Sequence, residues 1–256
     1  MCYDDNARPP EPPKKNGKAR GEDIALTAED GNRFAAYIAH PEHPSGPQAL
    51  ILPDIRGLHQ FYKELALRFA EVGITALAID YFGRTAGISS RAEPFEFMPH
   101  VQKLRLSTLI QDIRAALTYL RTNTGADQPV FMVGFCLGGT LSYMTGTHDL
   151  GLTGVIGFYA GISRDFGSGK KLLDVAEQIR YPSLGLFGGA DQGIPVNAVH
   201  TLDEKLSKAG FEHEVVIYPG APHGFFDRRS ADFAEASADA WRRVLGFIQA
   251  HSSAAH

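Results

Sequence analysis

Short runs of consecutive apolar residues alternate along the chain with longer segments in which apolar residues recur every three or four positions. A short continuous run is typical of a strand buried on both faces, and the longer periodicity is typical of an amphipathic helix. The runs that we interpret as buried strands are 49–53, 74–81, 129–136, 154–160 and 183–187. Helices are predicted within 61–72, 106–120, 141–144, 195–209 and 233–248. This alternation predicts an α/β fold, with a mainly parallel central sheet and helices on both faces.

The segments 24–28 and 34–40 are predicted to form a hairpin at one edge of this sheet. The turn between them is Glu29-Asp30-Gly31-Asn32, and an Asp-Gly pair is a strong hairpin signal. Residues 211–218 alternate polar and apolar side chains, which predicts a further strand. Residues 83–100 show weak periodicity, and a connection of this length between a strand and a helix is often functional.

A division into three parts follows from where the regular pattern begins and ends. Residues 1–21 are rich in Pro and Lys and contain almost nothing to bury, so we expect a flexible N-terminal extension. A basic docking arm is the alternative for this segment. Residues 22–250 are predicted to form one domain with one core, and 251–256 a C-terminal tail.

Charge and cysteine usage exclude several classes of protein. Lys and Arg number 25 against 29 Asp and Glu, a net charge of −4, which argues against a nucleic-acid partner. The two cysteines, Cys2 and Cys136, cannot build a disulfide framework, so a reducing compartment is favoured. The apolar runs are shorter than the ~18 residues that span a membrane, and the first 15 residues lack the apolar stretch of a secretory signal. We therefore expect a cytoplasmic protein that does not enter membranes.

The sharpest chemical motif is Gly134-Phe135-Cys136-Leu137-Gly138, which follows a predicted strand and precedes a predicted helix. Gly-x-Cys-x-Gly in this context is the nucleophile-elbow pattern with Cys in the place of Ser. The two glycines fit because the nucleophile sits on a tight, strained turn that leaves no room for side chains two residues away. The helix start places the Leu137 N–H beside the thiol and favours the thiolate. A buried structural cysteine is the alternative interpretation.

Two later residues complete a possible catalytic set. Asp191 ends a buried strand, and His223 lies in a loop just past the next strand. The order Cys136, Asp191, His223 is the nucleophile–acid–base order of α/β hydrolases, and each residue would lie at the carboxyl end of its strand. His223 would accept the thiol proton, and Asp191 would orient the imidazole.

With these motifs, the chain resembles the dienelactone hydrolase family of the α/β-hydrolase fold. The elbow GFCLGGT and the segments GGADQGIP and PGAPHGFF carry the resemblance, which extends from about Ile24 to Ile248. It implies that Cys136 is the nucleophile, His223 the base and Asp191 its orienting acid. It also implies an oxyanion hole made of the backbone N–H groups of Leu137 and Ile55.

The resemblance also implies substrate-binding residues. Asp54 stands where the family carries a Glu that contacts the Cys and is displaced by substrate, and it is one methylene shorter. Arg84 matches the first of two arginines that hold the substrate carboxylate. Asp227 occupies the place of the second, with Arg228 as the neighbouring substitute. Arg56, His59 and Tyr81 are further candidates for the pocket wall.

We therefore predict an enzyme that opens a small ester or lactone, preferably an anionic one, through an acyl group on Cys136. No cofactor, metal, nucleic acid or membrane partner is expected, and the protein would be a monomer or a homodimer. One alternative is a carboxylesterase or thioesterase that uses the same triad on another substrate. The other is a non-catalytic protein in which Cys136 is a reactive thiol.

Overall fold

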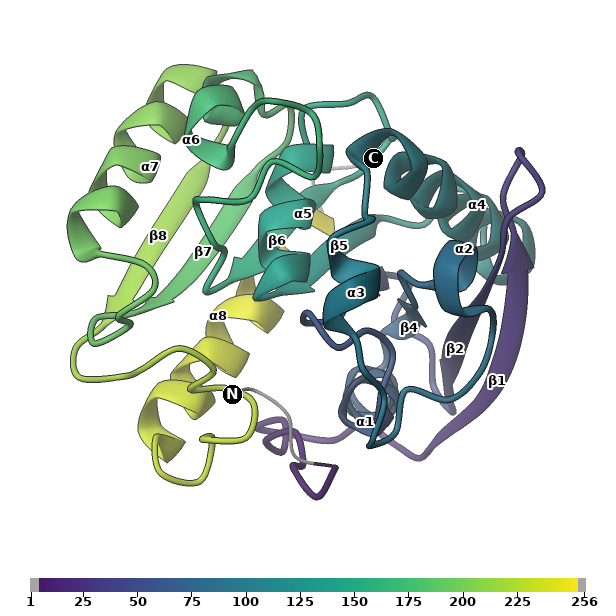
Figure 1. Ribbon diagram of the computed structural model, residues 1–256. Helices are drawn as coiled ribbons and strands as arrows, with labels where there is room; N and C mark the ends of the chain where they lie inside the picture. Colours follow the sequence, from purple (N-terminus) through teal and green to yellow (C-terminus); the bar gives the residue numbers. More distant parts are fainter. Residues whose placement is uncertain (1–4, 253–256) are drawn as a thin grey trace.

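The computed structural model, which describes residues 5–252, is built around one sheet of eight strands (Figure 1). The strands are β1 (Ala19–Thr27), β2 (Arg33–Pro41), β3 (Gln48–Leu52), β4 (Thr75–Ile79), β5 (Val130–Phe135), β6 (Gly154–Phe158), β7 (Ser183–Gly188) and β8 (His213–Tyr218). Their order in the sheet is β1-β2-β4-β3-β5-β6-β7-β8. The strands from β4 to β8 in this order are parallel, and the β1–β2 hairpin adds two antiparallel pairings at one edge. The predicted α/β fold is therefore confirmed.

The helices differ widely in length. The longer ones are α1 (Gln60–Glu71), α4 (Leu106–Thr124), α5 (Leu137–Thr145), α7 (Val196–Ala209) and α8 (Ala234–Ser252). Single turns form α2 (Gly83–Ala86), α3 (Met98–Val101), α6 (Leu172–Val175) and the 3₁₀ helix η1 (Ala176–Gln178). Two of these single turns lie in the 83–100 stretch, or at its end, where no element is predicted from the sequence. A helix of one turn buries too little to leave a periodic pattern.

Strand β5 shows how helices cover both faces of the sheet. Phe131 packs against Phe247 of α8, with ring centroids 6.0 Å apart, and Phe135 packs against Tyr62 of α1 at 5.6 Å. Met132, on the opposite side of the strand, accepts a hydrogen bond from the Thr145 hydroxyl of α5 on its sulfur at 3.2 Å. Successive side chains of a strand point to opposite faces, so α1 and α8 cover one face and α5 the other.

Residues 5–16 lie against α1 and α8 (Figure 1). The Trp241 indole N–H donates to the Pro10 carbonyl at 2.9 Å, and the Asn16 N–H donates to the Glu71 carbonyl at 2.7 Å. Glu11 forms an ion pair with Arg68 at 2.7 Å. The structure also differs from the expected boundary at residue 21, because β1 already begins at Ala19. The flexibility expected of residues 1–21 stays a prediction.

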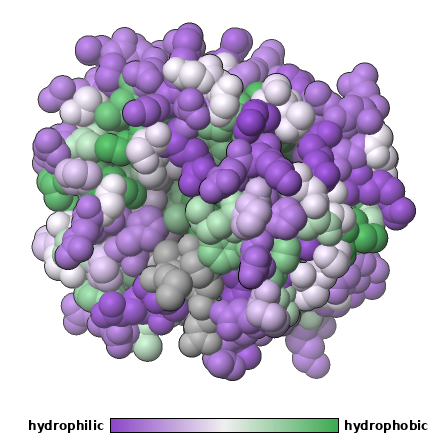
Figure 2. Space-filling model, viewed as in Figure 1, coloured by the Kyte–Doolittle hydropathy of each residue, from purple (hydrophilic) through white to green (hydrophobic). Residues whose placement is uncertain are grey.

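Polar residues cover most of the face shown in Figure 2, and apolar residues form small separate patches there. None of the helices formed by residues 5–252 is both long and apolar enough to cross a bilayer. The expected cytoplasmic location stays a prediction.

Candidate active site

Cys136 occupies a strained turn between β5 and α5. Its backbone angles are φ 55° and ψ −113°, in a region that residues other than glycine rarely adopt. The turn is packed against backbone on both sides. A Cβ on Gly134 would overlap the Gly138 carbonyl, and a Cβ on Gly138 would overlap the Leu52 carbonyl. The two glycines of the motif are therefore required by close backbone packing, as the elbow pattern predicts.

Asp191 and His223 form a hydrogen-bonded pair at the ends of β7 and β8. The His223 Nδ1 lies 2.7 Å from the Asp191 Oδ2. The Asp191 side chain is almost fully buried, and its other oxygen accepts the Gly193 N–H at 2.8 Å. An acid so held keeps the imidazole in one orientation, with the proton on Nδ1 and with Nε2 as the remaining proton acceptor.

Tyr159 connects this pair to the elbow. Its ring centroid lies 4.9 Å from that of His223, and it follows Phe158, whose carbonyl accepts the Cys136 N–H at 3.0 Å. Cys136, Asp191 and His223 thus lie at the carboxyl ends of β5, β7 and β8, at one edge of the parallel sheet. Active sites of open α/β sheets occur at this edge.

The two candidate oxyanion donors lie in different elements. Leu137 is the first residue of α5, so its N–H has no acceptor within the helix. Ile55 lies in the loop after β3. This loop is held because the Arg56 N–H donates to the Asp54 side chain at 2.9 Å and the Leu58 N–H donates to Asp80 at 3.0 Å.

Asp54 is buried, and both of its oxygens are engaged. One accepts the Arg56 N–H, and the other lies 3.3 Å from the His59 Nε2. The charge of Asp54 also acts on two buried tyrosines. Burial raises the pKa of Tyr62 and of Tyr81 well above the usual value, and the charges of both Asp54 and Cys136 raise it further. Tyr81 donates its hydroxyl to the Pro53 carbonyl at 2.6 Å, which fixes its buried ring against the residue that precedes Asp54.

Tyr62 is a site residue that the sequence analysis did not identify. It belongs to the buried stripe of α1, where a tyrosine reads as an ordinary core residue. Its hydroxyl is buried, and within residues 5–252 it has no hydrogen-bond partner. Burial raises its pKa, and the charges of Asp54, Asp227 and Cys136 add to this effect. Its ring packs edge-on against His59, with centroids 5.0 Å apart.

Asp227 lies beside Tyr159, although the family pattern has an arginine at this position. Its side chain is buried and accepts a hydrogen bond from the Tyr159 hydroxyl at 3.5 Å. It also accepts the backbone N–H of Arg228, whereas the Arg228 residue itself is exposed. The structure thus places a carboxylate, rather than a cation, next to the Tyr159 ring.

Arg84 is engaged by two carboxylates at another place in the molecule. It forms an ion pair with Asp30 in the hairpin turn and a second one, at 2.9 Å, with Asp112 of α4. Burial raises the pKa of Asp112. The hydrogen bond from Asn32 and the charge and hydrogen bond of Arg84 oppose that rise. Binding of a substrate carboxylate by Arg84 would require that it leave these partners.

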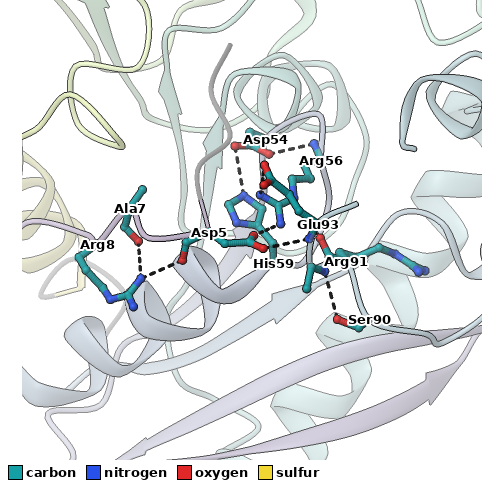
Figure 3. A network of polar contacts seen from close by, with 10 residues as sticks. Asp5, Ala7, Arg8, Asp54, Arg56, His59, Ser90, Arg91 and Glu93 are labelled. Atoms are coloured by element: carbon teal, nitrogen blue, oxygen red, sulfur yellow. Dashed lines mark hydrogen bonds and ion pairs between the residues drawn. The ribbon is translucent and has the colours of Figure 1, made fainter. Parts of the chain in front are cut away.

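Arg56 is one of the most deeply buried charged residues of the chain, with 1% of its surface exposed. Figure 3 shows its guanidinium between Asp5 of the N-terminal segment and the loop that carries Arg91 and Glu93. It forms an ion pair with Asp5, and its Nε donates to the Arg91 carbonyl at 2.9 Å.

In the part of the chain that the structure describes, no cluster of three or more His, Cys, Asp or Glu side chains has the arrangement of a metal site.

Comparison with known proteins adds an independent finding. The sequence profile of the Dienelactone hydrolase family matches residues 34–252. A protein of Methylorubrum extorquens named "Putative carboxymethylenebutenolidase" is 30% identical over 245 residues, which cover 93% of this chain and 84% of that protein. A protein of Escherichia coli with the same name is 28% identical over 225 residues, 86% of this chain and 83% of its own.

Solved structures agree with the sequence relatives. A crystal structure from Klebsiella pneumoniae, titled as that of a putative dienelactone hydrolase, superposes with a TM-score of 0.78 at 25% identity. The match covers 90% of this chain and 98% of the other.

Proposed function

Because this chain belongs to the dienelactone hydrolase family, we propose that it hydrolyses a carboxylic ester or lactone through a covalent thioester on Cys136. The observation that carries the proposal is the position of Cys136 on a strained elbow at the start of α5, at the same sheet edge as the hydrogen-bonded pair of Asp191 and His223. A structural cysteine would need neither the backbone strain nor the ordered pair.

The first half-reaction transfers the acyl group to sulfur. His223 Nε2 takes the thiol proton, and the Cys136 thiolate attacks the carbonyl carbon. The negative charge that develops on the carbonyl oxygen is stabilised by the N–H groups of Leu137 and Ile55. The tetrahedral intermediate collapses, the bond to the leaving oxygen breaks, and His223 returns its proton to that oxygen. Asp191 stabilises the imidazolium while it carries the proton.

The second half-reaction returns the enzyme to its starting state. His223 removes a proton from water, and the hydroxide attacks the carbonyl carbon of the thioester. The carbon–sulfur bond breaks, the product leaves as a carboxylic acid, and the imidazolium proton restores the thiol. Every atom of the steps comes from substrate, water and the three side chains.

Asp54 is proposed as a positioning residue that influences the proton of the thiol. Its carboxylate is buried, and it stands where the family carries a Glu that contacts the Cys. A negative charge at that place disfavours the thiolate. His59 holds one of its oxygens at 3.3 Å, so the imidazole of His59 fixes where this charge lies.

Two classes of substrate, anionic and neutral, are candidates. The match of Arg84 to the family's carboxylate-binding arginine favours a small anionic lactone. A neutral ester or thioester is favoured by Asp227, because a buried carboxylate at the second arginine position repels an anion. Hydrolysis of matched neutral and anionic aryl esters, compared by kcat/KM, separates the two.

The test of the proposal is hydrolysis of dienelactone and of these esters by the wild type and by Cys136→Ala and Asp191→Asn. We expect Cys136→Ala to remove turnover and Asp191→Asn to lower kcat by about 10³–10⁴-fold, because the imidazole loses its orientation. Mass spectrometry of quenched wild type should show the acyl group on the peptide that contains Cys136. Ser207→Ala on the exposed side of α7 serves as the control. Alkylation of Cys136 without turnover of any ester would contradict the proposal and favour the reactive-thiol alternative.

A further inference from the structure

The guanidinium of Arg56 is buried but incompletely satisfied. Its Nε donates to the Arg91 carbonyl, and its Nη2 forms an ion pair with Asp5. Within the described residues its Nη1 has no hydrogen-bond partner, and Glu93 Oε1 lies 3.8 Å from it. A buried cation needs a counter-charge at hydrogen-bond distance, and here this charge comes from a segment 51 positions earlier in the chain.

The carboxylate of Asp5 sits in a two-sided cradle. One oxygen contacts Arg56, and the other accepts the backbone N–H of Glu93 at 2.9 Å (Figure 3). Burial raises the pKa of Asp5, but the hydrogen bonds from Glu93 and Arg56 outweigh this effect and lower it. Asp5 is therefore an ionised carboxylate held by one guanidinium and one amide, which is how proteins bind carboxylate ligands.

A cavity of about 590 Å³ adjoins this cradle. It lies between the β1–β2 hairpin, the start of α1 and residues 88–92, and Asp5 forms part of its wall. Its lining combines apolar side chains, such as Ile24, Leu58 and Ile88, with Asp23 and Lys63, which form an ion pair with each other. Arg56 is not part of the lining. Asp5 thus stands between the cavity and the buried guanidinium.

We propose that Arg56 and the Glu93 N–H form a carboxylate-binding site, which Asp5 occupies as a tethered internal ligand and from which an external carboxylate displaces it. The external ligand is a small molecule that has one carboxylate and an apolar body, because the cradle takes the former and the cavity the latter. This inference goes beyond the proposed hydrolase function and does not depend on it.

Displacement of Asp5 affects the N-terminal segment, because Asp5 is the described residue that ties the start of this segment to the Asp54–His59 loop. Arg56 shares that loop with Asp54 and directly follows Ile55, the proposed oxyanion donor, in the sequence. An internal competitor reduces the apparent affinity of an external ligand to the intrinsic affinity multiplied by the fraction of molecules in which the site is free.

The test is the affinity of the full chain for benzoate, measured by calorimetry, with benzamide as the neutral ligand of the same shape. We expect Asp5→Ala to bind benzoate about tenfold or more tightly than the wild type, because the internal competitor is gone. Asp23→Ala is the matched control, since Asp23 lines the same cavity but pairs with Lys63. It should bind benzoate like the wild type, and no variant should bind benzamide more tightly.

The role of Arg56 is tested by the double variant Arg56→Gln with Asp5→Ala, which should lose the benzoate affinity gained by Asp5→Ala alone. A second measurement does not need an Arg56 variant and so remains available if the double variant does not fold. Benzoate should raise the melting temperature of Asp5→Ala by more than that of the wild type, because the anion replaces Asp5 as the partner of Arg56. Equal benzoate affinity of Asp5→Ala and wild type, or an equal gain in Asp23→Ala, would overturn the inference. Turnover is not a readout here, so failure of the hydrolase proposal would leave these results unaffected.

Discussion

Gly138 and Gly246 both lie in helices, but only Gly138 is packed against backbone. A Cβ on Gly138 would overlap the carbonyls of Leu52 and Pro53, whereas a Cβ on Gly246 of α8 would meet nothing within 4 Å. The same substitution should therefore have opposite effects at the two positions.

We expect Gly138→Ala to lower the free energy of unfolding by about 3 kcal/mol, because rigid backbone cannot move aside. Gly246→Ala should raise it by up to about 1 kcal/mol, because alanine is the better helix former. Urea unfolding of both variants measures the two changes. Equal effects at the two positions would contradict the packing described for the elbow.

At the same scale, the sequence analysis identified residues whose role depends on local spacing. Cys136, Asp191 and His223 each follow a recognisable strand, and the structure brings them to one sheet edge. Tyr62 was not identified because its position in the apolar stripe of α1 is that of an ordinary core residue. Within the described residues, its buried hydroxyl without a hydrogen-bond partner distinguishes it from such a residue. The two partners of Arg84 were not foreseen, because Asp30 and Asp112 lie 54 and 28 positions away in the chain.

At the scale of elements, Arg84 of α2 joins the turn of the β1–β2 hairpin to α4. The Asp112 partner is buried, and its folded-state pKa lies above the usual 3.8. Stability therefore falls as the pH rises from 3.8 through the folded-state value, because ionisation is more costly in the folded protein. Arg84 limits this cost by pairing with the ionised form.

We expect Arg84→Gln to lower the free energy of unfolding by about 1–2 kcal/mol at pH 7, and by less near pH 4, where a larger fraction of Asp112 is protonated than at pH 7. Arg114→Gln is the matched control, because Arg114 is an exposed arginine of α4, the helix that carries Asp112, and makes one long hydrogen bond. If Arg84 instead binds the substrate, the variant should raise KM for the anionic ester alone. Chemical denaturation at the two pH values and the ester pair decide between these outcomes.

At the scale of the whole molecule, helices cover both faces of one sheet, and Trp241 lies in α8 on the face that α1 and α8 cover. Trp241 is the single tryptophan of the chain, and it packs on Phe69 of α1 and on Phe226, with ring centroids 5.0 and 5.6 Å away. Its environment therefore depends on α8, α1 and the N-terminal segment together.

We expect tryptophan fluorescence and far-ultraviolet circular dichroism to show the same urea midpoint, because one shared core favours a single cooperative transition. Two separate midpoints would show that the face formed by α1 and α8 unfolds independently of the rest. The two midpoints should be measured for the wild type with and without 0.2 M salt, since the exposed ion pairs of residues 8–15 weaken in salt.

The overall architecture could be predicted because buried parallel strands leave continuous apolar runs. Strands β4, β5 and β6 fall within those runs, β3 and β7 each extend one residue beyond them, and the Asp-Gly turn indicated the edge hairpin. The single-turn helices α2, α3 and α6 could not be predicted, because they have no periodicity of their own. The contacts of residues 5–16 were also missed, since ion pairs between distant positions leave no pattern in a local window.

The position of β8 has a consequence for folding kinetics. It is an edge strand that pairs with β7 in the described sheet, and His223 lies in the loop that follows it. The imidazole can therefore reach the elbow only after β7 is in place and β8 has docked on it. A refolding chain should regain its helical signal before it regains esterase activity, and an intermediate that lacks this last docking would hold a thiol with no base beside it.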